Sequence, residues 1–138
     1  MLVSMMSAAL LLAAQVASAQ PANAIPTDIA VVEPAVLAPD CGGLLRAQAF
    51  CVSSRMDQME AIGEAYIAQL GEKGWIAADG DANRVIFIKR REAGGCDGLQ
   101  MVAFFDPAKP QTADETAYLA FANIPGDVCA APAEGADQ

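Results

Sequence analysis

The side chains with the greatest capacity for chemistry in this chain are its four cysteines, Cys41, Cys51, Cys96 and Cys129. Cysteine thiolates can hold a zinc ion, but zinc sites are typically built from close pairs such as Cys-x-x-Cys, often completed by histidines. Here neighbouring cysteines lie ten or more residues apart and the chain contains no histidine. The spacing therefore favours two disulfide bonds over a zinc site or a redox-active thiol pair.

Three carboxylates, Asp57, Glu60 and Glu64, recur at spacings of three and four residues and would share one face of a helix. Paired carboxylates can act as acid and base in glycoside hydrolysis. On an exposed helix face, however, such residues are far more often the solvated side of the helix. We therefore predict no catalytic residue, and keep a small secreted hydrolase that uses carboxylates without histidine as the alternative function.

A second acidic cluster, Asp79-Gly80-Asp81-Ala82-Asn83, matches the first five positions of an EF-hand calcium loop. The match then fails, because Arg84 occupies the position that needs glycine and Arg90 the position that needs a bidentate glutamate. These residues are also typical of a turn between two strands. We therefore predict a hairpin turn, with no metal ligand and no cofactor.

Other catalytic machinery has no candidates. Without histidine, neither a Ser-His-Asp nor a Cys-His arrangement can form. Ser53 and Ser54 are the only serines after residue 19, and Ser54 is expected to cap a helix that begins at Arg55. The basic run Lys89-Arg90-Arg91 could protect a sheet edge or contact an acidic partner, but most such runs are solvated surface.

The first nineteen residues have the pattern of a cleavable signal peptide, with an apolar run from Ala8 to Ala14 and small residues at Ala17 and Ala19. The pattern departs from the usual one in having no Lys or Arg before the apolar run. The run is too short to cross a bilayer comfortably. We expect an exported protein, periplasmic or secreted, that begins at Gln20 and has no membrane span after cleavage.

The charge of the chain limits its partners. Seventeen acidic and eight basic residues give a net charge of −9, which repels phosphate backbones and anionic lipid, so nucleic acid is not expected as a partner. Half of the eight prolines lie in residues 20–40, which predicts an extended, Pro-rich arm. Residues 130–138 are expected to be a disordered tail. The folded domain should then span residues 41–129.

A single long helix is predicted from Arg55, because apolar residues recur every three or four positions and acidic residues fall between them. A shorter helical turn is expected over residues 44–50. The buried stripe of the long helix would consist of Met56, Met59, Ile62, Gly63, Tyr66, Ile67 and Leu70.

After the helix the apolar period changes to two, which indicates strands. No connection between them is long enough for a helical crossover, so the sheet should be antiparallel. The fold class is therefore α+β: one main amphipathic helix followed by a four-stranded antiparallel meander, stapled by two disulfides. The expected strands are residues 75–78, 84–89, 99–105 and 116–123.

The predicted hairpin decides between the three disulfide pairings. Cys96 precedes the third strand and Cys129 follows the fourth, so both lie at the open end of the hairpin. Their midpoint, between residues 112 and 113, falls in the connecting loop, as an in-register hairpin requires. Neighbouring strands are about 5 Å apart, close to the Cα separation of a disulfide. We expect Cys96–Cys129, which leaves Cys41–Cys51.

Both faces of the predicted sheet are apolar, whereas a helix about 10 Å wide cannot cover even one face of four strands spaced about 4.8 Å apart. The uncovered face is a candidate interaction face, and the Pro-rich arm, residues 44–50 or another chain could cover it. We assign to it Val102, Phe104, Leu119 and Phe121.

From this face follows the functional expectation: a small exported binding module of the cell envelope or periplasm. It would bind a protein or a small apolar ligand through a sheet face or edge, and the protein partner could be a second copy of the chain.

Overall fold

The computed structural model describes residues 25, 26 and 28–130. Residues 1–24 lie outside this range, and with them the predicted signal peptide and Gln20; so do all residues of the predicted tail except Ala130. Among the described residues, no helix is long and apolar enough to cross a membrane.

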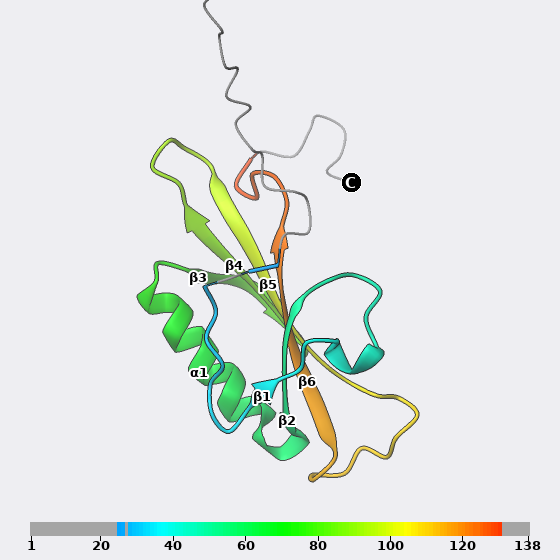
Figure 1. Ribbon diagram of the computed structural model, residues 1–138. Coiled ribbons are helices and arrows are strands. Elements are labelled where there is room, and N and C mark those ends of the chain that lie inside the picture. Colours follow the sequence, from blue (N-terminus) through cyan, green and yellow to red (C-terminus); the bar gives the residue numbers. More distant parts are fainter. Residues whose placement is uncertain (1–24, 27, 131–138) are drawn as a thin grey trace, which may run out of the picture.

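Six strands form one antiparallel sheet in the order β1-β2-β6-β5-β4-β3 (Figure 1). A 17-residue helical segment follows β2 and consists of a 3-10 turn, η2 (Met56–Gln58), and an α-helix, α1 (Met59–Glu72). A second 3-10 turn, η1, spans Cys41–Gly43. The strands are β1 (Val36–Leu37), β2 (Phe50–Arg55), β3 (Ile76–Asp81), β4 (Arg84–Arg90), β5 (Cys96–Phe105) and β6 (Thr116–Ile124).

The structure confirms the α+β class, the meander of β3 to β6, and the disulfides Cys41–Cys51 and Cys96–Cys129. The acidic cluster forms the predicted hairpin turn. Its residues up to Asp81 extend β3, and the Asp81 carboxylate accepts a hydrogen bond from the backbone N–H of Asn83 at 3.0 Å. The turn residues thus satisfy one another within the hairpin, as Asp and Asn commonly do.

Two strands were not expected. The segment predicted as a helical turn contains no helix, and Phe50–Arg55 forms β2, which pairs with β6 and, at its other side, with β1. Ser54 therefore lies in a strand opposite Ala117 and does not cap the helix; its hydroxyl bonds the side chain of Gln58 instead. The helical segment begins at Met56, after this strand ends.

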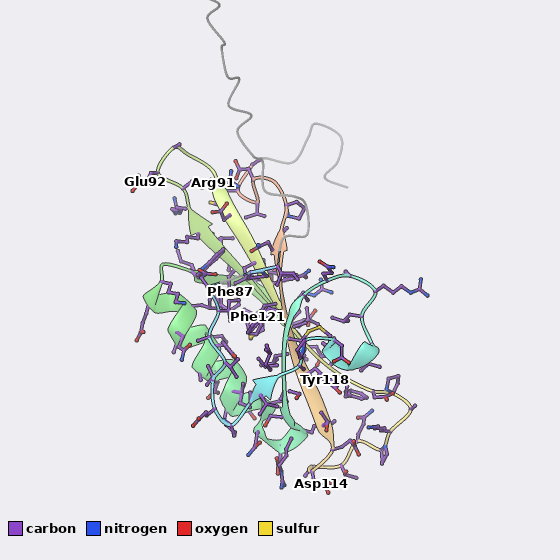
Figure 2. All side chains as sticks on the ribbon, in the orientation of Figure 1. Phe87, Arg91, Glu92, Asp114, Tyr118 and Phe121 are labelled. Carbon is purple, nitrogen blue, oxygen red and sulfur yellow. A yellow bond between two sulfur atoms is a disulfide. The ribbon has the colours of Figure 1, made fainter. Side chains whose placement is uncertain are left out.

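The main core lies between α1 and one face of the sheet, which we call the helix face. Ile62, Tyr66 and Leu70 are the buried residues of α1. They pack with Phe87 and Phe121 from the sheet, and the rings of Tyr66 and Phe121 are 4.7 Å apart between centroids (Figure 2). Complete burial of such large side chains supplies most of the hydrophobic stabilisation in a domain of this size.

The Pro-rich arm also lies on the helix face, beside α1. Ile29, Ala35 and Val32 join the main core. The hydroxyl of Tyr66 donates a hydrogen bond to the carbonyl of Ala30 at 2.7 Å and accepts one from the N–H of Val32 at 3.1 Å. Up to Ala35 the arm therefore adds width to the helix layer, and only its last residues, from Ala38 on, reach the opposite face.

That opposite face, the far face, is covered in part by the segment between β1 and β2. Ala38 and Cys41 pack there against Ala120, and Tyr118 packs beside them next to η1 (Figure 2). Gly42 approaches Tyr118 so closely that a Cβ at this position would meet its hydroxyl oxygen at 2.5 Å. The disulfide from Cys41 to Cys51 in β2 holds this segment against the sheet.

The predicted interaction face is wrong in its membership. The register pairs Phe104 with Tyr118 and Met101 with Phe121, so Phe104 and Phe121 point to opposite faces. Leu119 and Phe121 are buried in the main core, whereas Val102 and Phe104 are half-buried on the far face. The four residues therefore do not lie on one face of the sheet.

A hydrogen-bond network surrounds the second disulfide. The Asp127 carboxylate accepts hydrogen bonds from the backbone N–H groups of Cys96 at 2.8 Å and Cys129 at 3.0 Å. These bonds hold the pKa of Asp127 below its usual range, because they favour the charged carboxylate. Arg91 donates to the carbonyl of Gly126 at 2.8 Å and ties the same turn to the end of β4.

Candidate functional site

The helix layer does not cover the helix face completely. The arm flanks α1 on the side of β1 and β2, but nothing in the described part of the chain fills the other flank, between α1 and the turn of the β3–β4 hairpin. There the structure has a groove with a volume of about 550 Å³. This volume is in the range of small-molecule and side-chain binding pockets.

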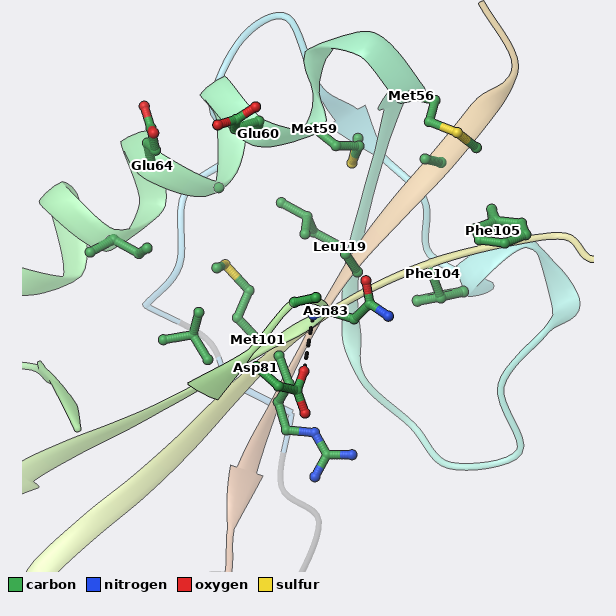
Figure 3. Close-up of a pocket in the computed structure, with 17 residues that line it drawn as sticks. Met56, Met59, Glu60, Glu64, Asp81, Asn83, Met101, Phe104, Phe105 and Leu119 are labelled. Atoms are coloured by element: carbon green, nitrogen blue, oxygen red, sulfur yellow. Dashed lines mark hydrogen bonds between the residues drawn. The ribbon is translucent and has the colours of Figure 1, made fainter. Parts of the chain in front are cut away.

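The groove is largely apolar. Its floor is the helix face of β4, β5 and β6, its first wall is η2 and α1, and its second wall is the hairpin turn at Asp81–Arg84 (Figure 3). Small residues on the floor and in the helix keep it open, because a glycine or an alanine fills little of the space that a larger side chain would occupy. The apolar lining consists of Met56, Met59, Gly63, Ile67, Ala82, Val85, Met101, Ala103, Phe104, Phe105, Ala117 and Leu119.

Gly63 is the clearest of these small residues. It lies in the middle of α1, where glycine is less stable than alanine by roughly 0.5–1 kcal/mol. A Cβ at Gly63 would point towards the methyl group of Met101, 3.9 Å away, and so into the groove. The missing side chain therefore leaves space at the point where α1 passes over the sheet.

Three methionines line the groove, Met56 and Met59 from the helical segment and Met101 from β5. The chain has six methionines, and the other three are Met1, Met5 and Met6 in the predicted signal peptide. Every methionine after residue 19 thus contributes to this one surface. Unbranched, polarizable methionine side chains adapt to different apolar partners and are common on binding surfaces for that reason.

Charged side chains surround the opening. Glu60 and Glu64 belong to the α1 wall, and Figure 3 shows their carboxylates pointing away from the sheet, at the solvent edge of the groove. Asp81 and Arg84 belong to the hairpin wall. Three carboxylates and one guanidinium therefore form the rim.

The three carboxylates predicted on one helix face do not converge. Asp57 lines a different, smaller cavity of about 320 Å³ between α1 and the arm, together with Pro34 and Ala61. It forms an ion pair with Arg55 at 2.8 Å, and this hydrogen-bonded contact holds the pKa of Asp57 below its usual range. Only Glu60 and Glu64 remain at the groove.

The other predicted candidates lie elsewhere. Lys89 lies over the ring of Trp75, with its ammonium nitrogen 5.9 Å from the ring centroid, and Arg91 pairs with Asp97 at 2.8 Å. Strand β4, which ends at Arg90, is not an edge strand, because β3 pairs along its outer side. Cys96, Asp127 and Cys129 come close enough to hold a metal ion, but both sulfur atoms belong to the disulfide.

Comparisons with known proteins give no family and no relative for this chain. The chain matches no protein-family model, no curated protein and no solved structure. The groove is therefore the feature of the molecule that bears on its function.

The groove was not predicted from the sequence, although the incomplete cover that produces it was. The width of one helix relative to four strands predicted incomplete cover of the helix face, but the interaction face was assigned to the opposite side. The sequence did contain a signal for the groove. Met56, Met59 and Gly63 lie on one side of the predicted helix, and Met101 lies in a predicted strand.

Proposed function

We propose that this chain is an exported binding module and that the groove between α1 and the β3–β4 hairpin is its ligand site. The observation that carries the proposal is the lining: an open, largely apolar groove of about 550 Å³ to which every methionine after residue 19 contributes. An adaptable apolar groove favours burial of apolar ligand groups, which is the main driving force for such binding.

Export is part of the same proposal. It is supported by the signal-peptide pattern of residues 1–19 and by two disulfides, which are typical of oxidising compartments outside the cytoplasm. In the periplasm or in the medium, the chain would bind its ligand outside the cytoplasm.

The alternative, a hydrolase that uses carboxylates, has less support. Acid–base hydrolysis needs two carboxyl groups that face one another across the bond to be broken, about 5–10 Å apart. Glu60 and Glu64 lie side by side on one wall and point towards solvent, and Asp57 lines a different cavity (Figure 3). The binding function therefore remains the better proposal.

The proposal is tested by filling the groove from within. Gly63→Leu would place four carbon atoms beside Met101, and it should leave the fold intact because leucine is a better helix former than glycine. We expect the wild-type chain from Gln20 onward to bind the neutral apolar dye N-phenyl-1-naphthylamine saturably at one site. Gly63→Leu should weaken this binding at least tenfold, as measured by fluorescence titration.

Gly71→Leu is the matched control. Gly71 also belongs to α1, but a Cβ there would meet nothing within 4 Å, and the residue does not line the groove. This variant should bind the dye as the wild type does. Equal binding by both leucine variants, or no saturable binding by the wild type, would show that the groove is not a ligand site.

A further inference from the structure

The charged residues at the rim of the groove indicate the charge of its ligand. Among the charged residues that line it, Glu60, Glu64 and Asp81 are acidic and Arg84 alone is basic. None of these four side chains takes part in the salt bridges found among the described residues, which join Arg55 to Asp57, Arg91 to Asp97 and Lys109 to Glu115. Three carboxylates against one guanidinium leave the rim acidic, and of the three the Asp81 carboxylate also accepts a hydrogen bond from the N–H of Asn83.

The negative charge of several candidate ligands disfavours them as occupants of the groove. A second copy of the chain carries the same net charge of −9, and nucleic acid or an anionic membrane surface has the same sign. The chain's own C-terminal residues, 131–138, contain Glu134 and Asp137 and no Lys or Arg. Each of these would bring negative charge to an acidic rim. A cationic ligand with apolar groups is the complementary partner.

The spacing of the rim carboxylates favours a peptide over a compact molecule. Glu60 and Glu64 are one helical turn apart, about 6 Å along the axis of α1. Asp81 is on the facing wall. A helical segment lying along the groove would present apolar side chains at i, i+3 and i+4 to the floor and could place basic side chains, four residues apart, beside the α1 wall.

Resting on the proposed function, we infer that the ligand is a cationic amphipathic peptide segment of another protein. Its apolar side chains would enter the groove between Met59 and Met101, and its Lys or Arg side chains would lie at the Glu60 and Glu64 rim. Methionines would accommodate apolar side chains of different shapes, so the selectivity would come from charge rather than from one residue type.

The test uses three 16-residue helical peptides that share one leucine face and differ in their polar positions, which are Lys, Gln or Glu. Calorimetric titration of the disulfide-bonded chain from Gln20 onward should give affinities in the order Lys, Gln, Glu, with at least tenfold between the extremes. The Lys peptide should lose affinity in high salt and the Gln peptide should not.

The variant Glu60→Gln/Glu64→Gln should weaken the Lys peptide about three- to tenfold and leave the Gln peptide unchanged, since exposed ion pairs are individually weak. Glu72→Gln, at the end of α1 and outside the groove, is the matched control and should change neither affinity.

The outcomes separate this inference from the proposed function. Equal affinity for the three peptides, or an equal loss with Glu72→Gln, would overturn the cationic preference and leave the groove as an apolar site. Binding of the apolar dye without binding of any peptide would overturn the peptide inference alone. If neither dye nor peptide binds, both fail.

Discussion

Replacing Cys96 and Cys129 together by alanine is expected to lower the free energy of unfolding by about 4 kcal/mol. This disulfide closes 33 residues of chain and joins the open end of the β5–β6 hairpin to the turn that follows it. In the chain-entropy model the stabilisation grows with the length of the closed loop. Loss of the bond also leaves the turn attached to the sheet through hydrogen bonds, such as those of Asp127 and Arg91, without a covalent link.

The companion variant without Cys41 and Cys51 provides the comparison. That disulfide closes only 10 residues, so the model predicts a loss of about 3 kcal/mol. Urea denaturation of both double variants, followed by circular dichroism, measures the order. A smaller loss for the Cys96 and Cys129 variant would mean that loop length does not govern the stabilisation and that packing around Cys51 dominates instead.

The second large effect is expected at Phe121. This residue is fully buried on the helix face, between the rings of Tyr66 and Phe50 and opposite Met101. Phe121→Ala would open a cavity under α1 that the surrounding sheet cannot fill, and should cost about 3–5 kcal/mol of stability. It should also disturb the floor of the groove, because Met101 loses its neighbour across the strands.

Phe104→Ala is the matched control, since both residues are phenylalanines in the same hairpin. Phe104 is half-buried on the far face and stacks on Tyr118 with ring centroids 5.2 Å apart. Its loss should cost about 1–2 kcal/mol, mostly from partial burial and the ring contact. Equal losses for the two variants, measured by urea denaturation, would contradict the assignment of the two faces.

The same pair of residues shows what the sequence could and could not predict. Alternation within β5 and β6 correctly divided each strand into two faces, but it did not say which face of one strand matches which of the other. A hairpin centred between residues 112 and 113 would place Phe104 opposite Phe121. The observed register is shifted and places Phe104 opposite Tyr118. An odd shift in register moves a whole strand to the other face.

The disulfide was nevertheless predicted correctly, because its geometry tolerates this shift. The strict partner of Cys96 in the observed register would be Gly126. The chain turns there, and the N–H of Val128 donates to the carbonyl of Cys96 at 3.2 Å, which brings Cys129 back towards the strand. Proximity of the two cysteines followed from the hairpin, whereas the pairing of their neighbours depended on a turn that no local pattern specified.

Strands β1 and β2 were missed because their support is distant in the chain. Phe50–Arg55 is a short apolar and serine-rich segment whose main partner, β6, begins at Thr116. Before that partner is known, Ser53 and Ser54 followed by an acidic residue resemble a helix cap. Tertiary pairing outweighed the local preference, as is common for short strands.

The extended form of the arm was predicted from its prolines, whereas its position in the fold was not predicted. Prolines exclude a helix, but docking depends on Tyr66 of the neighbouring α1, whose hydroxyl donates a hydrogen bond to the carbonyl of Ala30 and accepts one from the N–H of Val32. That contact joins residues more than thirty positions apart. It places the arm on one flank of α1 and leaves the other flank open, which is why the groove lies where it does.

The central claim, that this groove binds a ligand, is tested most directly by the methyl signals of its methionines. In the chain from Gln20 onward, Met56, Met59 and Met101 are the only methionines, so methyl-labelled protein should give three signals, all from the groove. On titration with the leucine–lysine peptide, we predict that all three signals shift together with one dissociation constant, and that Gly63→Leu abolishes the shifts. Saturable peptide binding that leaves all three signals unmoved would place the ligand elsewhere and contradict the account.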